Sequence, residues 1–527
     1  MSSKILKNFN ATLVDKFDGI FATSTANTYI TIGRPVSWAG NKVQSPEETT
    51  NYINQVYRDM IAMKKIIASD LQIVVPREDW VNDTPYDAYS DSVDLFTTLS
   101  ITPMQGTVNV AANSIVVNGN NTQFSTNTSN GGIIRINGVT REVLNIANNT
   151  YLTVNSRFST SSINSNVAYS VVNNSPHYAQ KFYVRNTKDQ VFKCLYNNEG
   201  ANSTIMPEIT VAGQLPENPY IEMGDGYKWK YLYTISSNKK LKFMSSEWMP
   251  VTTDTLVART AGAGSIDIIE ILNGGDGYIS SGNSNSASIV SIEGDGTGAI
   301  ITAKIEDGTF TGLNILDGGE GYSYANVTIQ DTGTTGANAE FDVQIAPVNG
   351  HGSSPIHELG ASHVMIAVEL DADEGGKIPT ISGDEKLDYR QIGLLLNPRL
   401  YPTTTAFAND SVYSTTTRLN LVAPSSGNKY ALDETVYQGS NIVNATFTGT
   451  VVHWDYDTKT LHLNNTRGTV DLEKPIVGQS SATQTSIITK EDNEISPFTG
   501  RLLYIDNRSP IVRDDQQSEV IRLIIQI

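Results

Sequence analysis

The sequence predicts a mainly β, multi-domain protein, a β-sandwich scaffold with one N-terminal helix and three inserted small antiparallel β modules. Helical periodicity is scarce, and most of the chain alternates apolar and polar residues between Gly, Asn and Asp turns. Four aromatic-rich blocks are separated by three stretches rich in Gly, Asn, Thr and Ser. At 527 residues the chain is also too long for a single hydrophobic core.

The change in composition along the chain divides it into seven segments. Scaffold blocks are expected at 1–105, 173–260, 348–427 and 491–527. Inserted β modules are expected at 106–172, 261–347 and 428–490. Such modules are tolerated at surface loops when their two ends lie close together.

One helix is expected from about Pro46 to Ile67. Ser45 and Glu48 have the Ser-x-x-Glu spacing of a capping box, and Pro46 would occupy the first helical position. An apolar stripe at helical spacing follows, made by Tyr52, Val56, Met60 and Met63.

The first insert is expected to form a small antiparallel barrel or sandwich, because short strands alternate with Asn-Gly and Asn-Asn turns. The expected strands are Thr107–Val110, Ser114–Asn118, Ile133–Ile136, Arg141–Ile146, Tyr151–Val154 and Val167–Val172.

The second insert is an internal duplication. The segment Ile269–Tyr278 returns as Leu313–Tyr322, and each copy is followed by a strand and a second Gly-rich turn, at Gly294–Ala299 and Asp331–Ala337. Glycine permits positive φ in these turns, and the tyrosine is expected to close the turn over the next strand.

The third insert is expected to contain one β hairpin and a further strand. The hairpin covers Thr450–Leu463, and the second β segment covers Thr469–Val477.

The densest marker of the scaffold is a Gly-Asp-Gly turn followed by an aromatic strand, at Gly224–Ile235. Strand side chains repeat every two residues, so four rings are expected on one face. These candidate site residues are Tyr227, Trp229, Tyr231 and Tyr233. Two interpretations stay open, since the rings fit the scaffold core or an intersubunit surface. The terminal strand Val520–Ile525 is likewise either a core strand or an edge that pairs with a partner.

The composition excludes several classes of function. A net charge of −18 without a Lys/Arg run argues against nucleic-acid binding. The single cysteine, Cys194, lies in an apolar strand and is expected to be a buried side chain rather than a nucleophile. Met1–Asn8 lacks the apolar run of a signal peptide, and no run reaches membrane-spanning length, so synthesis in a reducing cytoplasm is expected.

No motif specifies a reaction, a cofactor or a small-molecule substrate. His351, His357 and His363 are six residues apart, wider than zinc ligands usually are, so hydrogen-bonding loop histidines are favoured over a metal. His453 and His462 are expected to face each other across the hairpin as a surface pair.

Acidic residues are also weak site candidates, because their spacing does not match a known site. The acidic Gly loops of the duplication lack the periodicity of a calcium site. The run Asp371–Glu374 is expected to be an exposed turn rather than a catalytic carboxylate pair.

The scaffold blocks resemble the baseplate wedge subunit encoded by gene eight in T-even-like contractile-tailed bacteriophages. The resemblance covers about 300 residues and skips the three inserts. Its motifs occur in family order, at Asn27–Pro35 with Trp38, Val75–Trp80, Val191–Leu195, Glu222–Ile235, Tyr389–Pro398, Leu503–Ile511 and Glu519–Ile525.

The resemblance implies a non-enzymatic virion structural protein of the tail baseplate, assembled in the host cytoplasm. Its expected partners are a second copy in a two-fold dimer and other wedge proteins, with no nucleic acid, membrane or small-molecule substrate. The inserts depart from the family pattern and leave the peripheral partners open. A receptor-binding or glycan-degrading tail spike is the alternative that the Asn-, Thr- and Gly-rich inserts permit.

Overall fold

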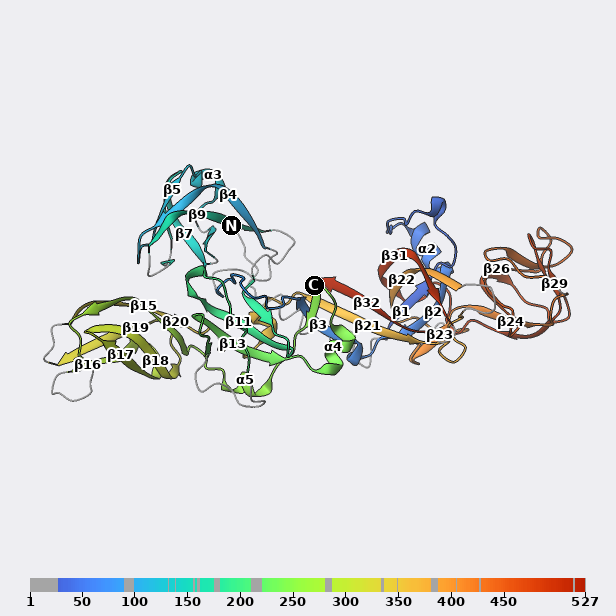
Figure 1. Ribbon diagram of the computed structural model, residues 1–527. Helices are drawn as coiled ribbons and strands as arrows, with labels where there is room; N and C mark the ends of the chain where they lie inside the picture. The colour runs from blue at the N-terminus through green and yellow to red at the C-terminus, as the bar shows by residue number, and fades with distance from the viewer. Residues whose placement is uncertain are drawn as a thin grey trace. The chain divides into compact units, whose positions relative to one another are not determined.

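The computed structural model describes most of the chain. The described residues are 27–89, 99–130, 132–137, 139–154, 157–158, 162–174, 181–209, 220–279, 287–332, 336–347, 349–380, 387–403, 405–425, 428–514 and 517–526. Met1–Asn8, on which the absence of a signal peptide was judged, lies outside them. As predicted, the chain is mainly β, with several antiparallel sheets and few helices (Figure 1).

The chain forms two compact units. Unit 1 contains Ile73–Val364, and unit 2 contains Asp15–Gln72 and Met365–Ile525. No helix among the described residues combines the length and the apolar character that crossing a bilayer requires.

Unit 2 is built on a five-stranded sheet in the order β23-β2-β1-β22-β31. Its strands are β1 (Thr28–Gly33), β2 (Met60–Lys65), β22 (Leu387–Leu396), β23 (Val412–Ser414) and β31 (Arg501–Arg513). Three scaffold blocks that are separated in sequence by inserts therefore share one sheet. The central strand β1 pairs antiparallel with both β2 and β22, and all six of its residues are buried.

The predicted N-terminal helix is only half correct. The helix α2 spans Thr50–Asp59, and the Thr49 side chain caps it by accepting a hydrogen bond from Tyr52 N at 3.3 Å. Residues Met60–Lys65, expected to continue the helix, form β2 instead. Met60 to Met63 are all buried in this sheet, where β1 and β23 pair with the two edges of β2. Pairing with these distant strands therefore outweighs the helical spacing of the apolar residues.

The third insert forms a seven-stranded sheet of unit 2 in the order β29-β28-β25-β26-β27-β24-β30. Its strands are β24 (Thr417–Leu421), β25 (Thr435–Gln438), β26 (Phe447–Asp455), β27 (Thr460–Gly468), β28 (Ile476–Gly478), β29 (Gln484–Thr485) and β30 (Ile487–Glu491). The predicted hairpin is confirmed as β26 and β27. Residues 469–475 are not strand, so the second predicted segment is correct only at its end, and the module begins at Thr417 rather than at 428.

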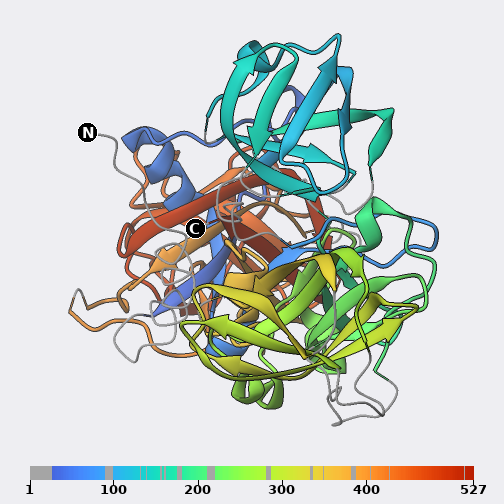
Figure 2. The same cartoon turned by 90° about the vertical axis from the view of Figure 1, so that its left-hand side faces the viewer.

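The first insert in unit 1 is a closed barrel in the order β4-β5-β8-β7-β6-β9, which decides between the barrel and the sandwich (Figure 2). Its elements are β4 (Leu99–Val110), β5 (Val116–Asn120), α3 (Phe124–Asn127), β6 (Ile133–Ile136), β7 (Val139–Asn148), β8 (Tyr151–Val154) and β9 (Ile163–Asn174). Each predicted strand overlaps an observed one, and the module starts at Leu99 instead of 106. Strand side chains such as Val108 and Val117, together with Phe124 of α3, fill the interior.

The duplicated insert interleaves its two halves. Its strands are β15 (Ile266–Asp276), β16 (Ala287–Gly294), β17 (Thr297–Glu306), β18 (Thr309–Glu320), β19 (Ala325–Thr332) and β20 (Ala337–Ile345). Each strand of the first half pairs with one of the second, as β15–β20, β16–β19 and β17–β18. Tyr278 and Tyr322, the equivalent tyrosines, are both buried in the shared core.

The remaining scaffold of unit 1 is a four-stranded sheet in the order β10-β11-β13-β12. These strands are β10 (Tyr183–Arg185), β11 (Gln190–Asn197), β12 (Ile221–Glu222) and β13 (Tyr227–Thr234). Separately, β3 (Leu71–Pro76) pairs with β14 (Trp248–Pro250).

The short helices of the two units are η1 (Ala39–Asn41), η2 (Ala68–Asp70), η3 (Asn198–Gly200), α4 (Ser237–Phe243), α5 (Thr255–Thr260) and α6 (Pro355–Glu358).

The terminal strand combines features of both interpretations left open for it. β32 (Ser518–Gln526) is the last strand of its sheet, beside β21 (His363–Asp371). Ile521 and Leu523 are buried, whereas Val520 is exposed. The strand therefore buries one face while standing at a sheet edge.

Candidate functional site

The four aromatic residues of β13 are buried within the chain. Tyr227 and Trp229 are fully buried, Tyr233 is 1% exposed and Tyr231 is 8% exposed. The candidate intersubunit surface is therefore corrected to scaffold core, because these rings leave no accessible face for a second copy. Tyr86, from a neighbouring segment, packs edge-to-face against Trp229, with the two ring centres 5.6 Å apart.

The expected single aromatic face is broken at Tyr233. Tyr231 pairs with Phe192 of β11, but Tyr233 pairs with the adjacent Val191, so β13 carries a bulge at this point. Tyr227, Trp229 and Tyr231 share one core cluster. Tyr233 belongs to the other face, where its hydroxyl donates to Pro250 O at 3.2 Å.

The Gly-Asp-Gly turn before β13 is organised by Asp225. Its Oδ2 accepts from Thr204 N at 2.7 Å and from Ile205 N at 2.9 Å, which holds the neighbouring loop against the turn. Gly226 has φ 83°, and a Cβ there would lie 2.7 Å from the Asn198 side chain. The positive φ and the short distance to the Asn198 side chain therefore both require glycine at position 226.

A buried polar cluster lies behind the aromatic strand, on the opposite face of β11. The Lys193 ammonium is fully buried and donates to Glu358 Oε2 at 2.5 Å and to His351 Nδ1 at 2.5 Å. Its nitrogen also lies 4.1 Å from the centre of the Tyr89 ring. The other ring nitrogen of His351 is 3.2 Å from Asp267 Oδ2.

Electrostatics define the charge state of the buried polar cluster. Burial raises the pKa of Glu358, but the Lys193 charge and the His351 contacts outweigh it and hold that pKa below its ordinary value. Burial lowers the pKa of His351, and the adjacent Lys193 charge lowers it further. Burial likewise lowers the pKa of Lys193, while Glu358 acts against that shift. The cluster is accordingly an ion pair beside a neutral histidine.

The buried polar cluster joins three parts of unit 1. Lys193 comes from the scaffold strand β11, Asp267 from the first strand of the duplicated insert, and His351 and Glu358 from the segment that leaves that insert. Glu358 Oε1 also accepts from Gly352 N at 2.6 Å and from Ser354 N at 3.2 Å. The paired charges of Lys193 and Glu358 hold these parts together, and their burial leaves no surface at which a substrate would react.

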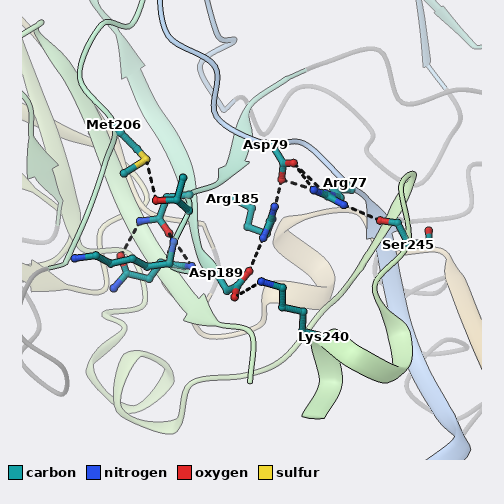
Figure 3. A network of polar contacts seen from close by, with 11 residues as sticks. Arg77, Asp79, Arg185, Asp189, Met206, Lys240 and Ser245 are labelled. Carbon is teal, nitrogen blue, oxygen red and sulfur yellow. Dashed lines mark hydrogen bonds and ion pairs between the residues drawn. The ribbon is translucent and has the colours of Figure 1, made fainter. Parts of the chain in front are cut away.

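A second polar network connects the scaffold segments of unit 1 (Figure 3). Arg77 donates to Asp79 Oδ2 at 2.6 Å and to Ser245 O at 3.0 Å. Arg185 donates to Asp79 Oδ1 at 2.7 Å and also pairs with Asp189, which Lys240 contacts at 2.8 Å. Burial would raise the pKa of Asp79, but its hydrogen bonds to Arg77 and Arg185 outweigh it and lower that pKa.

The histidines considered as metal ligands are placed in different surroundings. His351 belongs to the buried polar cluster, while His363 contacts Ser362 Oγ at 3.1 Å and packs against the Trp248 ring. In the part of the chain that the structure describes, no three His, Cys, Asp or Glu side chains are grouped to hold a metal. Both His351 and His363 make side-chain hydrogen bonds, but His363 is the first residue of strand β21 and not a loop residue.

The histidine pair of the hairpin is correctly paired but wrongly placed at the surface. His453 and His462 face each other across β26 and β27, with ring centres 5.7 Å apart. They are only 3% and 6% exposed, and they line one small pocket together with the segment around Ile378. Burial, with smaller effects from His453 and Arg418, lowers the pKa of His462 to about 3.

Cys194 and the acidic run behave largely as expected. Cys194 is fully buried, and burial raises the pKa of its thiol. In the run Asp371–Glu374, Glu374 accepts from Asp371 N at 2.8 Å and pairs with Lys64 at 2.5 Å. These carboxylates stabilise a turn.

Sequence reasoning missed the buried polar cluster. The available signal was Lys193 within the otherwise apolar run Val191–Tyr196, since a lysine inside a buried strand requires an acidic partner. The partners Asp267 and Glu358 are far away in sequence, so no local pattern identifies them. No protein-family model matches this chain, and no curated protein matches it by sequence.

Proposed function

We propose that this protein is a non-enzymatic structural subunit of the baseplate wedge of a contractile phage tail. In this role it would link the baseplate core to peripheral proteins during assembly and contraction. The proposal starts from the ordered resemblance of the scaffold blocks to that family. One observation carries it further, namely that the resembling motifs, distant in sequence, lie together within each unit.

In unit 2, three of these motifs are neighbouring strands. Tyr29 of the first motif pairs with Leu395 of the fifth, and Leu394 of the fifth pairs with Tyr504 of the sixth. Trp38 donates from its indole nitrogen to Arg508 O at 2.8 Å, which adds a further contact between the first and sixth motifs. These motifs supply a continuous scaffold that the third insert leaves uninterrupted.

In unit 1, the remaining scaffold motifs are similarly connected. Arg77 and Asp79, from the second motif, belong to the network of Figure 3. Phe192 and Cys194 of the third motif pair with Tyr231 and Trp229 of the fourth. A structural role is consistent with this use of aromatic and charged side chains in internal contacts rather than in an accessible cleft.

The proposed partners are a second copy of the chain and other wedge proteins within the virion. The wedge interpretation predicts a dimer near twice the 57.3 kDa mass of the chain in sedimentation equilibrium. It also predicts labelling at the baseplate when gold-conjugated antibody against the chain is viewed on virions by electron microscopy. A monomer at micromolar concentration, or labelling at fibre tips, would contradict it.

The tail-spike alternative predicts a different assembly and a different arrangement of the repeated module. Spikes are built from long stacks of parallel β coils. In this chain the two halves of the duplication pair antiparallel with each other and close one short module. A detergent-resistant trimer that releases oligosaccharide from host envelopes would favour the spike.

A further inference from the structure

A small cavity in unit 2 has the features of a binding site. It measures about 150 Å³ and lies between the end of α2, the hairpin strand β27 and the segment before β31. The lining includes Tyr57, Arg58, Asn464, Asn465, Asn493 and Phe498. A cavity of about 150 Å³ is the size that accommodates one six-membered ring, as an engineered cavity of that volume does with benzene.

Asn464, one of the residues that line the cavity, carries a buried acceptor that lacks a donor. Asn464 is 9% exposed, and its side-chain oxygen Oδ1 has no hydrogen-bond partner. Leaving such an atom unpaired is unfavourable, so a ligand hydroxyl or N–H that reached it would gain binding free energy.

The backbone around Asn464 is irregular at this place. Thr450 pairs with Asn464 and Thr448 with Arg467, so β27 carries one residue more than β26 between these pairs. The bulge includes Asn465, which has φ 51°. Bulges redirect side chains next to functional sites, and here the bulge brings consecutive polar residues, Asn464 to Thr466, to the cavity.

The opposite wall carries an exposed aromatic ring in a strained conformation. Phe498 is 51% exposed and has φ 58°, a region that bulky residues rarely adopt. Its ring centre is 6.0 Å from that of Tyr57, and the Arg58 guanidinium lies 5.9 Å from it. Strain combined with exposure favours a role in contact over a role in packing.

We propose that this cavity binds one neutral sugar ring of a glycan. A pyranose has an apolar C–H face that packs on an aromatic ring and a rim of hydroxyls that both donate and accept. The Phe498 ring matches the first property, while Asn464 Oδ1 as an acceptor and Arg58 as a donor match the second. No carboxylate or lysine is among the described residues that line the cavity, which suits an uncharged ligand.

The proposal is independent of the wedge role, since the cavity lies within unit 2 and needs no second subunit. The test is saturation-transfer NMR on the full-length chain with D-glucose, D-galactose, N-acetyl-D-glucosamine and L-rhamnose as separate probes. We expect transfer to the ring protons of at least one sugar, with a Kd in the millimolar range that a single ring permits.

Two substitutions probe opposite walls of the cavity. Asn464→Leu removes the unpaired acceptor, and Phe498→Ala removes the ring; each is expected to weaken binding about tenfold, the effect of losing one good contact. Phe407→Ala is the matched control, because Phe407 is also exposed beside an arginine, Arg399, but does not line the cavity.

The outcomes separate clearly. Loss of transfer in both cavity variants, with binding retained in Phe407→Ala, supports the site. Absence of transfer from all four sugars, or equal transfer in the cavity variants and the control, overturns it. If Asn464→Leu does not fold, as judged by circular dichroism, Thr466→Val at the exposed rim of the same bulge replaces it.

Discussion

Single residues in this chain show how strongly burial sets chemistry. Lys193 is fully buried, and its ammonium is matched by Glu358, by a neutral His351 and by the face of Tyr89. Removing one member of such an ion pair leaves a buried charge and typically costs about 3–5 kcal/mol. The Lys193–Glu358 ion pair therefore restricts the duplicated insert to one arrangement where it joins the scaffold, although the pair adds little net stability.

The buried His462 predicts a pH dependence of stability. Its folded-state pKa of about 3 lies below the value of about 6.5 in the unfolded chain, so the unfolded chain binds more protons at acidic pH. Its contribution is complete above about pH 6.5 and declines as pH falls toward 3. Between pH 7 and pH 5 the free energy of unfolding should fall by about 2 kcal/mol because of this residue.

This is measured by urea unfolding at the two pH values. In His462→Gln the decrease between pH 7 and pH 5 should be smaller by about 2 kcal/mol than in the unsubstituted chain. Val443→Ala, an exposed and non-titratable position of unit 2, is the control and should keep the full decrease. Identical pH dependence in all three proteins would contradict the assignment of a neutral buried His462.

At the scale of elements, each half of the duplicated insert supplies a tyrosine that packs on a turn of the other half. The Tyr278 hydroxyl accepts from Ala339 N at 3.3 Å, and the Tyr322 hydroxyl accepts from Ala299 N at 3.4 Å. Each tyrosine therefore closes the second Gly-rich turn of the opposite half. This corrects the sequence prediction, in which the tyrosine closes the turn over the next strand.

Close packing at these turns predicts a specific sensitivity. A Cβ at Gly336 would lie 2.2 Å from the Tyr278 ring, so Gly336→Ala should lower the free energy of unfolding by about 1–3 kcal/mol through overpacking. The measurement is the unfolding midpoint of the full chain by calorimetry, with its enthalpy.

The control for this prediction is Gly312→Ala in β18. Its nearest neighbour would be the Lys304 side chain at 3.6 Å, an ordinary contact, so the change should stay within about 0.5 kcal/mol. Combining Gly336→Ala with Tyr278→Leu should recover part of the loss. Equal effects of the two alanine substitutions would argue against a packed turn.

At the scale of the whole molecule, the scaffold is interrupted by modules that have cores of their own. The barrel core is formed by barrel residues alone, such as Val108, Ile134 and Leu152. The two ends of the barrel are adjacent, because Leu99 pairs with Asn174. An insertion with adjacent ends need not distort the host.

This arrangement predicts that the barrel is removable. A chain lacking residues 99–174, closed by a short Gly-Ser linker, should fold with the scaffold sheets intact. Calorimetry should show the loss of the barrel transition and the retention of the others. One cost is at Asp87, which is 1% exposed and loses its partner Arg135, so adding Asp87→Asn should recover part of the lost stability. A truncated chain that does not fold would show that scaffold and barrel fold as one unit.

Local pattern in the sequence determined the β class, the short strands of the first insert, the duplication and the position of the hairpin. These features depend on turns and alternation within about ten residues, which a single stretch of chain expresses by itself. The buried state of Cys194 could be predicted for the same reason, since its neighbours in the strand are apolar.

Tertiary structure alone decided which residues meet. Met60–Lys65 became a strand because β1 and β23 pair with it, and Tyr233 changed face because of a bulge against β11. The partners of Lys193, and the cavity around Asn464, come from segments far apart in the chain. Burial and pairing between distant segments depend on which strands become neighbours. The packing free energy of the whole unit determines those neighbours, and no local run of residues does.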